Sequence, residues 1–140
     1  MISHFVNRRA GFTCVIIAGC PQLNDYRAAA EVILANAFHD DDAAWMCDLL
    51  QSDFGSATNL QLLKLATFLD EVNPTRRKVA LISAKPFAKT ISKFALDHGL
   101  PDWGTFHEEV DAYRWITTGQ LADQAVPRLN FGSASSSSAT

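Results

Sequence analysis

Apolar residues along the chain follow two spacings, one typical of buried strands and the other of amphipathic helices. Short runs of apolar and β-branched residues with little polar interruption indicate strands inside a sheet. We expect such strands over residues 2–6, 12–18, 43–50, 78–83 and 104–106. Apolar residues three or four positions apart indicate helices that bury one face. We expect these helices from about residue 25 to 38, from about 57 to 72, from 86 to 98 and over 108–116.

Cap and turn residues set the order of these elements. Asn24 or Asp25 can cap the first helix, Pro86 fits the start of the third helix, and Gly99 fits its end. A turn over residues 7–11 makes the first two strands a hairpin. Each later strand follows a helix, and strands joined in this way lie parallel in one sheet. The sequence therefore predicts an α/β fold with a mixed, mostly parallel sheet of about five strands and about four helices.

Composition divides the chain into one folded unit and a C-terminal tail. The 140 residues are 48% apolar, which suits a single globular domain. We expect that domain over residues 2–117, followed by a loosely attached extension over 118–131. Residues 132–140 read GSASSSSAT, and no side chain there can bury useful apolar area. This tail is therefore expected to be disordered.

Charge and hydropathy argue against two classes of function. The chain carries 12 Lys and Arg against 15 Asp and Glu, for a formal net charge of -3. This acidic balance argues against a nucleic-acid-binding protein, whose surface would be basic. No apolar run reaches the roughly 18 residues that cross a bilayer, and the first residues lack the pattern of a secretory signal. We therefore expect a cytoplasmic domain with no membrane span and no nucleic-acid partner.

The common catalytic, metal-binding and cofactor-binding motifs do not occur in the sequence. Glycine-rich phosphate loops and a G-x-S-x-G turn are absent. The four histidines are scattered, and the three cysteines lack the spacing of metal ligands. Cys14 and Cys47 lie inside apolar runs and are expected to be buried thiols. The sequence thus predicts no metal site and no cofactor, and it favours a non-catalytic protein.

One stretch of polar residues stands where ligands collect in α/β proteins, beyond the carboxyl end of a buried strand. Asp48 is expected near the end of the third strand, and Ser56, Thr58 and Asn59 at the start of the next helix. Free backbone N–H groups and the helix dipole stabilise an anion at such a place, including a phosphate on Ser56 or Thr58. These four residues form the candidate regulatory or partner-binding site. The alternative is that Ser56, Thr58 or Asn59 only caps the helix.

Two other functions stay open on the sequence. A carrier of a small apolar or lipid-like ligand would need a pocket lined by aromatic side chains. The candidates for that pocket are Trp45, Phe87, Phe94, Trp103 and Trp115. An enzyme would need Asp48, Asp53 or Cys20 as its base or nucleophile.

Three segments, in this order of elements, resemble the STAS-type, SpoIIAA-like fold of anti-sigma-factor antagonists and of sulfate-transporter cytoplasmic domains. They are VIIAG at 15–19, WMCDLL at 45–50, and KVALIS at 78–83 together with the closing VDAYRWI at 110–116. The closing segment is similar to the ending of small stand-alone bacterial STAS-like proteins. The resemblance covers about residues 2–117 and specifies fold better than activity.

The resemblance implies a regulatory domain that binds a protein partner. In the antagonists, a partner kinase phosphorylates a Ser or Thr in an Asp-Ser-Ser-Gly-like turn before the second helix. Thr58 falls near that position, with Ser56 close by, although this chain reads GSATN at residues 55–59. Independently of the resemblance, exposed edges of the predicted sheet would permit a homodimer.

Overall fold

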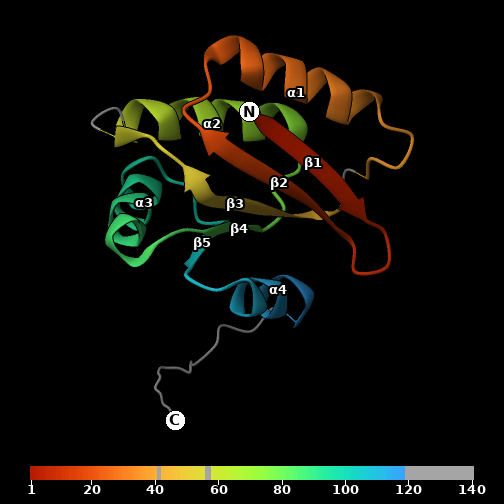
Figure 1. Cartoon of the computed structure of the whole chain (residues 1–140). Helices are drawn as coiled ribbons and strands as arrows, with labels where there is room; N and C mark the ends of the chain where they lie inside the picture. The colour runs from red at the N-terminus through yellow and green to blue at the C-terminus, as the bar shows by residue number, and fades with distance from the viewer. Residues whose placement is uncertain (41, 56–57, 119–140) are drawn as a thin grey trace.

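A single five-stranded sheet organises the protein, which was analysed as a computed structural model (Figure 1). The structure describes residues 1–40, 42–55 and 58–118. The expected extension and Ser-rich tail lie outside the described residues, apart from Thr118, so their boundaries stay predictions. The elements in chain order are β1 (Ile2–Asn7), β2 (Phe12–Gly19), α1 (Leu23–Ala35), β3 (Ala44–Ser52), α2 (Thr58–Val72), β4 (Val79–Ile82), α3 (Lys85–Asp97), β5 (Trp103–Phe106) and α4 (Glu109–Thr118).

The strands lie side by side in chain order, from β1 at one edge to β5 at the other. The hairpin of β1 and β2 is antiparallel, and every other neighbouring pair is parallel. The α/β fold with a mixed, mostly parallel sheet is therefore confirmed. No helix in the described part of the chain is long and apolar enough to span a bilayer.

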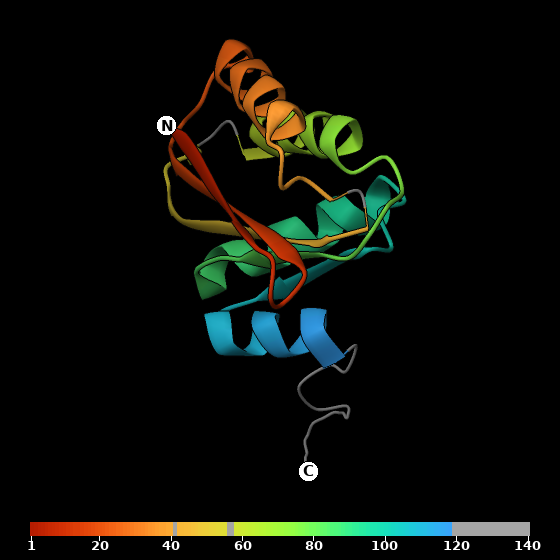
Figure 2. The ribbon, with the colours of Figure 1, turned by 90° about the vertical axis from the view of Figure 1, so that its right-hand side faces the viewer.

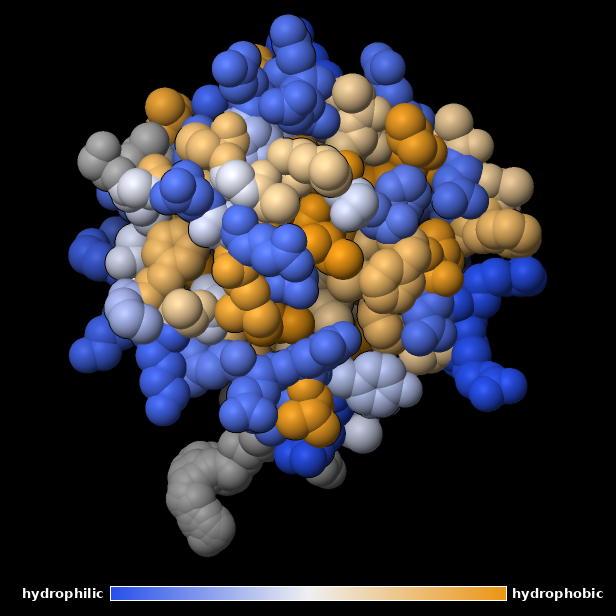
Figure 3. Space-filling view, in the orientation of Figure 1, coloured by the Kyte–Doolittle hydropathy of each residue, from blue (hydrophilic) through white to orange (hydrophobic). Residues whose placement is uncertain are grey.

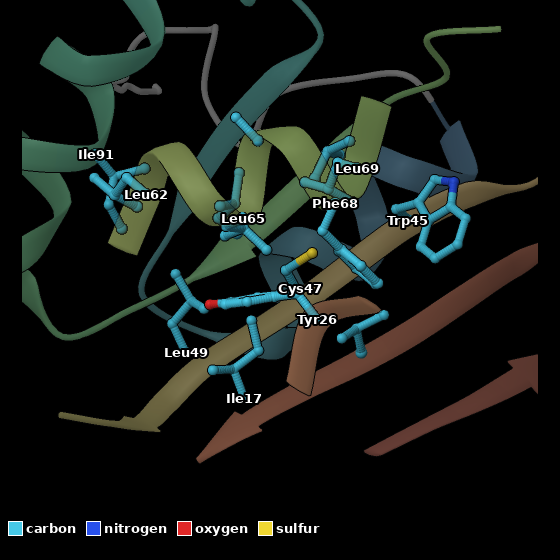
Figure 4. Close-up of a cluster of buried hydrophobic side chains, with 14 of the residues drawn as sticks. Ile17, Tyr26, Trp45, Cys47, Leu49, Leu62, Leu65, Phe68, Leu69 and Ile91 are labelled. Carbon is cyan, nitrogen blue, oxygen red and sulfur yellow. The ribbon is translucent and has the colours of Figure 1, made fainter. Parts of the chain in front are cut away.

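The helices divide the sheet into two unequal faces (Figure 2). Crossovers between neighbouring parallel strands are right-handed, so α1, α2 and α3 all cover the same face. That face holds the larger core, in which Trp45, Cys47 and Leu49 of β3 pack with the apolar side of α2 (Figure 4). Met46 points the other way, because side chains alternate along a strand, and it joins the smaller core beneath α4.

The boundaries of two elements differ from those expected. Helix α1 is capped by Gln22 rather than by Asn24 or Asp25, because the Asp25 carboxylate accepts the Gln22 N–H at 2.8 Å. The helix ends at Ala35 rather than at Phe38, since Asn36 leaves the helical conformation and its Oδ1 accepts the Phe38 N–H at 2.8 Å.

Strand β3 continues two residues beyond its expected end at Leu50. Gln51 and Ser52 pair with Ala18 and Gly19 of β2 after a shift in register. This pairing extends the strand through residues that read as a polar loop in the sequence. Because of this extension, Asp48 lies within β3 and not at the end of the strand.

Candidate functional site

The loop from β3 to α2 is held in place at the carboxyl ends of the parallel strands. The ring of Phe54 is 5% exposed and meets the edge of Phe87 on α3, with 5.8 Å between ring centroids. The Asp53 N–H donates to the Gly19 carbonyl at 2.8 Å. Gly55 has a φ of 55°, a left-handed conformation in which glycine carries little strain. The buried ring and the backbone bond therefore hold residues 53–55 against β2 and α3.

A small pocket of about 270 Å³ lies beside this loop. Residues from the end of β3, the loop, α2 and the start of α3 line it: Leu49, Leu50, Ser52, Asp53, Phe54, Gly55, Thr58, Ala84 and Phe87. Its volume is below the roughly 300–1,000 Å³ of typical small-molecule sites. The pocket suits a small group or one side chain of a partner better than a nucleotide-sized cofactor.

Thr58 and Asn59 lie at the start of α2, as the sequence predicted. Thr58 is the first helical residue, and its hydroxyl donates to the Gly55 carbonyl at 2.8 Å. This bond is the reverse of an N-cap, in which the side-chain oxygen accepts a backbone N–H. Asn59 is exposed. Ser56 lies outside the described residues, so its expected role stays a prediction.

Asp48 is separated from these residues by the sheet. Its neighbours Cys47 and Leu49 point into the larger core on the α2 side, so the Asp48 side chain points to the α4 side. One carboxylate oxygen accepts the Leu50 N–H at 2.9 Å. Because β3 continues to Ser52, Asp48 lies within the strand rather than at its end. The structure therefore brings together Thr58 and Asn59 and places Asp48 elsewhere.

A second hollow, which we call the α2–α3 groove, opens next to Asn59. Its volume is about 410 Å³, and it is lined by Asn59, Leu60, Leu63, Thr90, Lys93, Phe94, Asp97 and His98. Leu60 and Leu63 are 55% and 48% exposed, an unusual environment for two leucines on neighbouring positions of one helix. Both helices therefore contribute apolar and polar residues to the lining of the groove.

Polar and aromatic contacts fix the α3 wall of the groove. Lys93 Nζ and the Asp97 carboxylate form an ion pair at 2.7 Å, one helical turn apart. The His98 ring stacks on Phe94 with 4.0 Å between centroids, and its Nδ1 lies 3.0 Å from the Phe94 carbonyl oxygen. These contacts limit the freedom of both rings and so give the wall a defined shape.

The α2–α3 groove was not predicted, although the sequence of α2 carries a signal for it. The helix has apolar residues on its outer side as well as on the side that packs against the sheet. The apolar residues are Leu60, Leu62, Leu63, Leu65, Ala66, Phe68, Leu69 and Val72. A helix that needed to cover only the sheet would have a narrower apolar stripe.

The five aromatic residues proposed to line a ligand pocket do not share one. Trp45 and Phe94 are buried in the larger core, with Phe87 and Trp103 packed against it. Trp115 packs in the smaller core on the opposite face of the sheet. The alternation of side chains along β5 separates them, because Trp103 faces α3 while Phe106 faces α4 and contacts Trp115 at 5.4 Å between centroids. These rings therefore fill two cores.

The thiols fall into two classes. Burial raises the pKa of Cys14 to about 12, with smaller contributions from the charges of Asp48 and Glu109. Burial also raises the pKa of Cys47. Both thiols therefore stay neutral and are poor nucleophiles at physiological pH. Cys20 is exposed. Within residues 1–40, 42–55 and 58–118, no three His, Cys, Asp or Glu side chains gather to hold a metal ion.

A comparison with solved structures finds the same fold in a regulatory protein. The crystal structure of an anti-sigma factor antagonist from Mycobacterium paratuberculosis matches 83% of this chain and 94% of that chain, with a TM-score of 0.52 and 21% sequence identity. No family model and no curated protein sequence matches the chain. The chain therefore has the STAS-type, SpoIIAA-like fold that its sequence resembles.

Proposed function

We propose that this chain is a non-catalytic regulatory domain that binds a protein partner of the anti-sigma-factor type. The α2–α3 groove and the first turn of α2 form the binding surface in this proposal. The fold it shares with an anti-sigma factor antagonist supports a role of this kind.

The observation that carries the proposal is the pair of exposed leucines in the groove. Leu60 and Leu63 lie three residues apart on α2, so their side chains are neighbours on the helix surface. Charged and polar side chains, including Lys93 and Asp97, line the groove together with these leucines. Protein-binding surfaces usually combine exposed apolar side chains with polar ones in this way. A partner that inserts an apolar side chain here would bury both leucines.

Thr58 gives this surface a means of regulation. It lies one residue before Asn59, which lines the groove, and its hydroxyl is at the N-terminal end of α2. A phosphate on Thr58 would replace the hydroxyl donor to the Gly55 carbonyl with about -1.5 to -2 of charge. The helix dipole would favour that charge, and the charge would alter the edge of the groove. We expect phosphorylation here to weaken binding of a partner that contacts the groove.

The test is capture of partners from a lysate of the source cells with wild-type and substituted chains. We expect the double variant Leu60→Asp, Leu63→Asp to lose the captured partner by about tenfold or more, as at other interface hot spots. The control is Val32→Asp, which places one new carboxylate on α1 at a residue that is 59% exposed and outside the groove. The control should capture as much partner as the wild type.

Two results would contradict the proposal. Equal capture by the wild type and the Leu60, Leu63 variant would exclude the groove. Loss of capture with Val32→Asp alone would place the partner-binding surface on α1.

The regulatory role of Thr58 has its own test. Thr58→Glu should weaken capture of the partner, while Thr58→Val should retain it. If Thr58→Val removes the partner instead, the hydroxyl contacts the partner directly and phosphorylation is not the control.

A further inference from the structure

Strand β1 has an open edge with none of the usual features that prevent pairing. It occupies one end of the strand order, and within the described residues no strand pairs with its outer side. Its sequence, ISHFVN, contains no Pro, Lys, Asp or Glu. Charged residues and proline are the common means by which an edge strand avoids another chain. The opposite edge, β5, is shorter, with four residues against six in β1.

The hydrogen-bond pattern of the hairpin shows which groups of β1 point outward. Met1 and Ala18 exchange two backbone bonds, at 2.8 and 2.9 Å. Such pairs alternate along an antiparallel ladder, so Ser3, Phe5 and Asn7 also bond to β2. The N–H and C=O groups of Ile2, His4 and Val6 therefore point away from the sheet. These three residues are symmetric about His4.

We propose that β1 pairs with β1 of a second copy of this chain, antiparallel and around a two-fold axis at His4. In this register His4 faces His4 of the second copy, and Ile2 faces its Val6. All outward N–H and C=O groups of the three residues then find partners without a change in the fold. The two sheets become one continuous sheet, and the pairing closes on itself because the interface is the same on both copies.

The side chains at this edge support a second copy as the occupant. Phe5 is 49% exposed and lies on the same face of β1 as Ser3 and Asn7. In the proposed register the two Phe5 rings are diagonal neighbours on one face, at about 7–8 Å between backbones, which is within reach of aromatic side chains. Figure 3 looks toward this edge and shows apolar side chains gathered between α1 above and α4 below. The dimer would cover part of that surface.

The central backbone bond gives the first test. The variant His4→Pro removes the outward N–H, and proline is tolerated in an edge strand whose N–H faces solvent, so the monomer should keep its fold. Sedimentation of the wild type should show a monomer–dimer equilibrium. His4→Pro should raise the dissociation constant by about tenfold or more, because symmetry removes two bonds. The control His4→Ala keeps the N–H and should change the constant much less.

Cysteine cross-linking tests the register even if a variant weakens the fold. In a Cys20→Ser background, His4→Cys places two thiols on facing residues with Cα atoms about 5.5 Å apart, within disulfide range. Ile2→Cys is the control, because the two Ile2 positions would be about 13 Å apart along the strands. We expect a covalent dimer with His4→Cys and none with Ile2→Cys. Equal cross-linking of both variants, or a wild type that stays monomeric at millimolar concentration, would overturn the proposal.

Discussion

A methyl group added at Gly104 tests how α4 is attached to the sheet. A Cβ at this position would lie 2.9 Å from two carbons of the Trp115 indole and 3.0 Å from the ring of Phe106. Ordinary contacts between such atoms begin near 3.5 Å, so Trp115 has to move by about half an ångström or more. Overpacking of this kind costs about 1–3 kcal/mol. We therefore expect Gly104→Ala to lower the free energy of unfolding by that amount.

The cause of this loss can be separated from a general effect of alanine. The assay is urea unfolding of four chains: wild type, Gly104→Ala, Trp115→Phe and the double variant. The Trp115 atoms that block the new methyl are absent from phenylalanine, so Gly104→Ala should cost less in the Trp115→Phe background. A matched control is Gly99→Ala, where φ is 62° and no atom lies within 4 Å of the new Cβ. Its cost is a backbone effect and should be equal in both backgrounds.

A Gly104→Ala variant as stable as the wild type, or an equal cost in both backgrounds, would mean that Trp115 does not pack on β5. Trp115 also contacts Lys78 of the loop before β4. The Lys78 Nζ donates to the Trp115 carbonyl oxygen at 3.4 Å and lies 5.3 Å from the centroid of the Trp115 ring. These contacts hold the last helix over the smaller core.

Three more predictions follow from burial. Iodoacetamide should label Cys20 in the folded protein and leave Cys14 and Cys47 unlabelled until the chain unfolds. Labelling of Cys14 or Cys47 in the folded protein, detected by peptide mass spectrometry, would contradict their burial. Thermal stability should fall as the pH rises above 9.0, because the unfolded Cys14 thiol then loses a proton that the folded thiol keeps up to a pKa of about 12. Cys14→Ala should reduce this fall without removing it, because burial also raises the pKa of Cys47. Phe54→Ala should cost about 3 kcal/mol and increase proteolysis of the loop before α2; an unchanged loop would show that the ring does not anchor it.

The sequence predicted the sheet well because the strands are set by local composition. The apolar runs of β2, β3 and β4 have side chains buried on both faces, and such runs are typical of inner parallel strands. The position of Thr58 at the start of α2 followed from the same pattern. Helix boundaries were less predictable at α1, because Gln22 and Asp25 cap it together and no single preferred cap residue marks its start.

The composition of the candidate site could not be predicted from the sequence, because it depends on contacts between distant segments. Asp48 was expected at the end of a strand, but pairing of Gly19 with Ser52 extends β3 beyond it. Side chains alternate along β3, so Asp48 lies on the face opposite Cys47 and Leu49. The α2–α3 groove depends on how these two helices pack against each other. Trp115 lies apart from Trp103 because α4 packs on the opposite face of the sheet from α3.

The central claim is that the α2–α3 groove binds a protein partner, and hydrogen–deuterium exchange tests it directly. Exchange would be followed by mass spectrometry in the chain alone and in complex with the partner that it captures. We expect slower exchange in residues 58–63 and 90–98 of the complex, with no change in residues 23–35 of α1. Unchanged exchange in both groove segments, with new protection on α1 or α4, would contradict it.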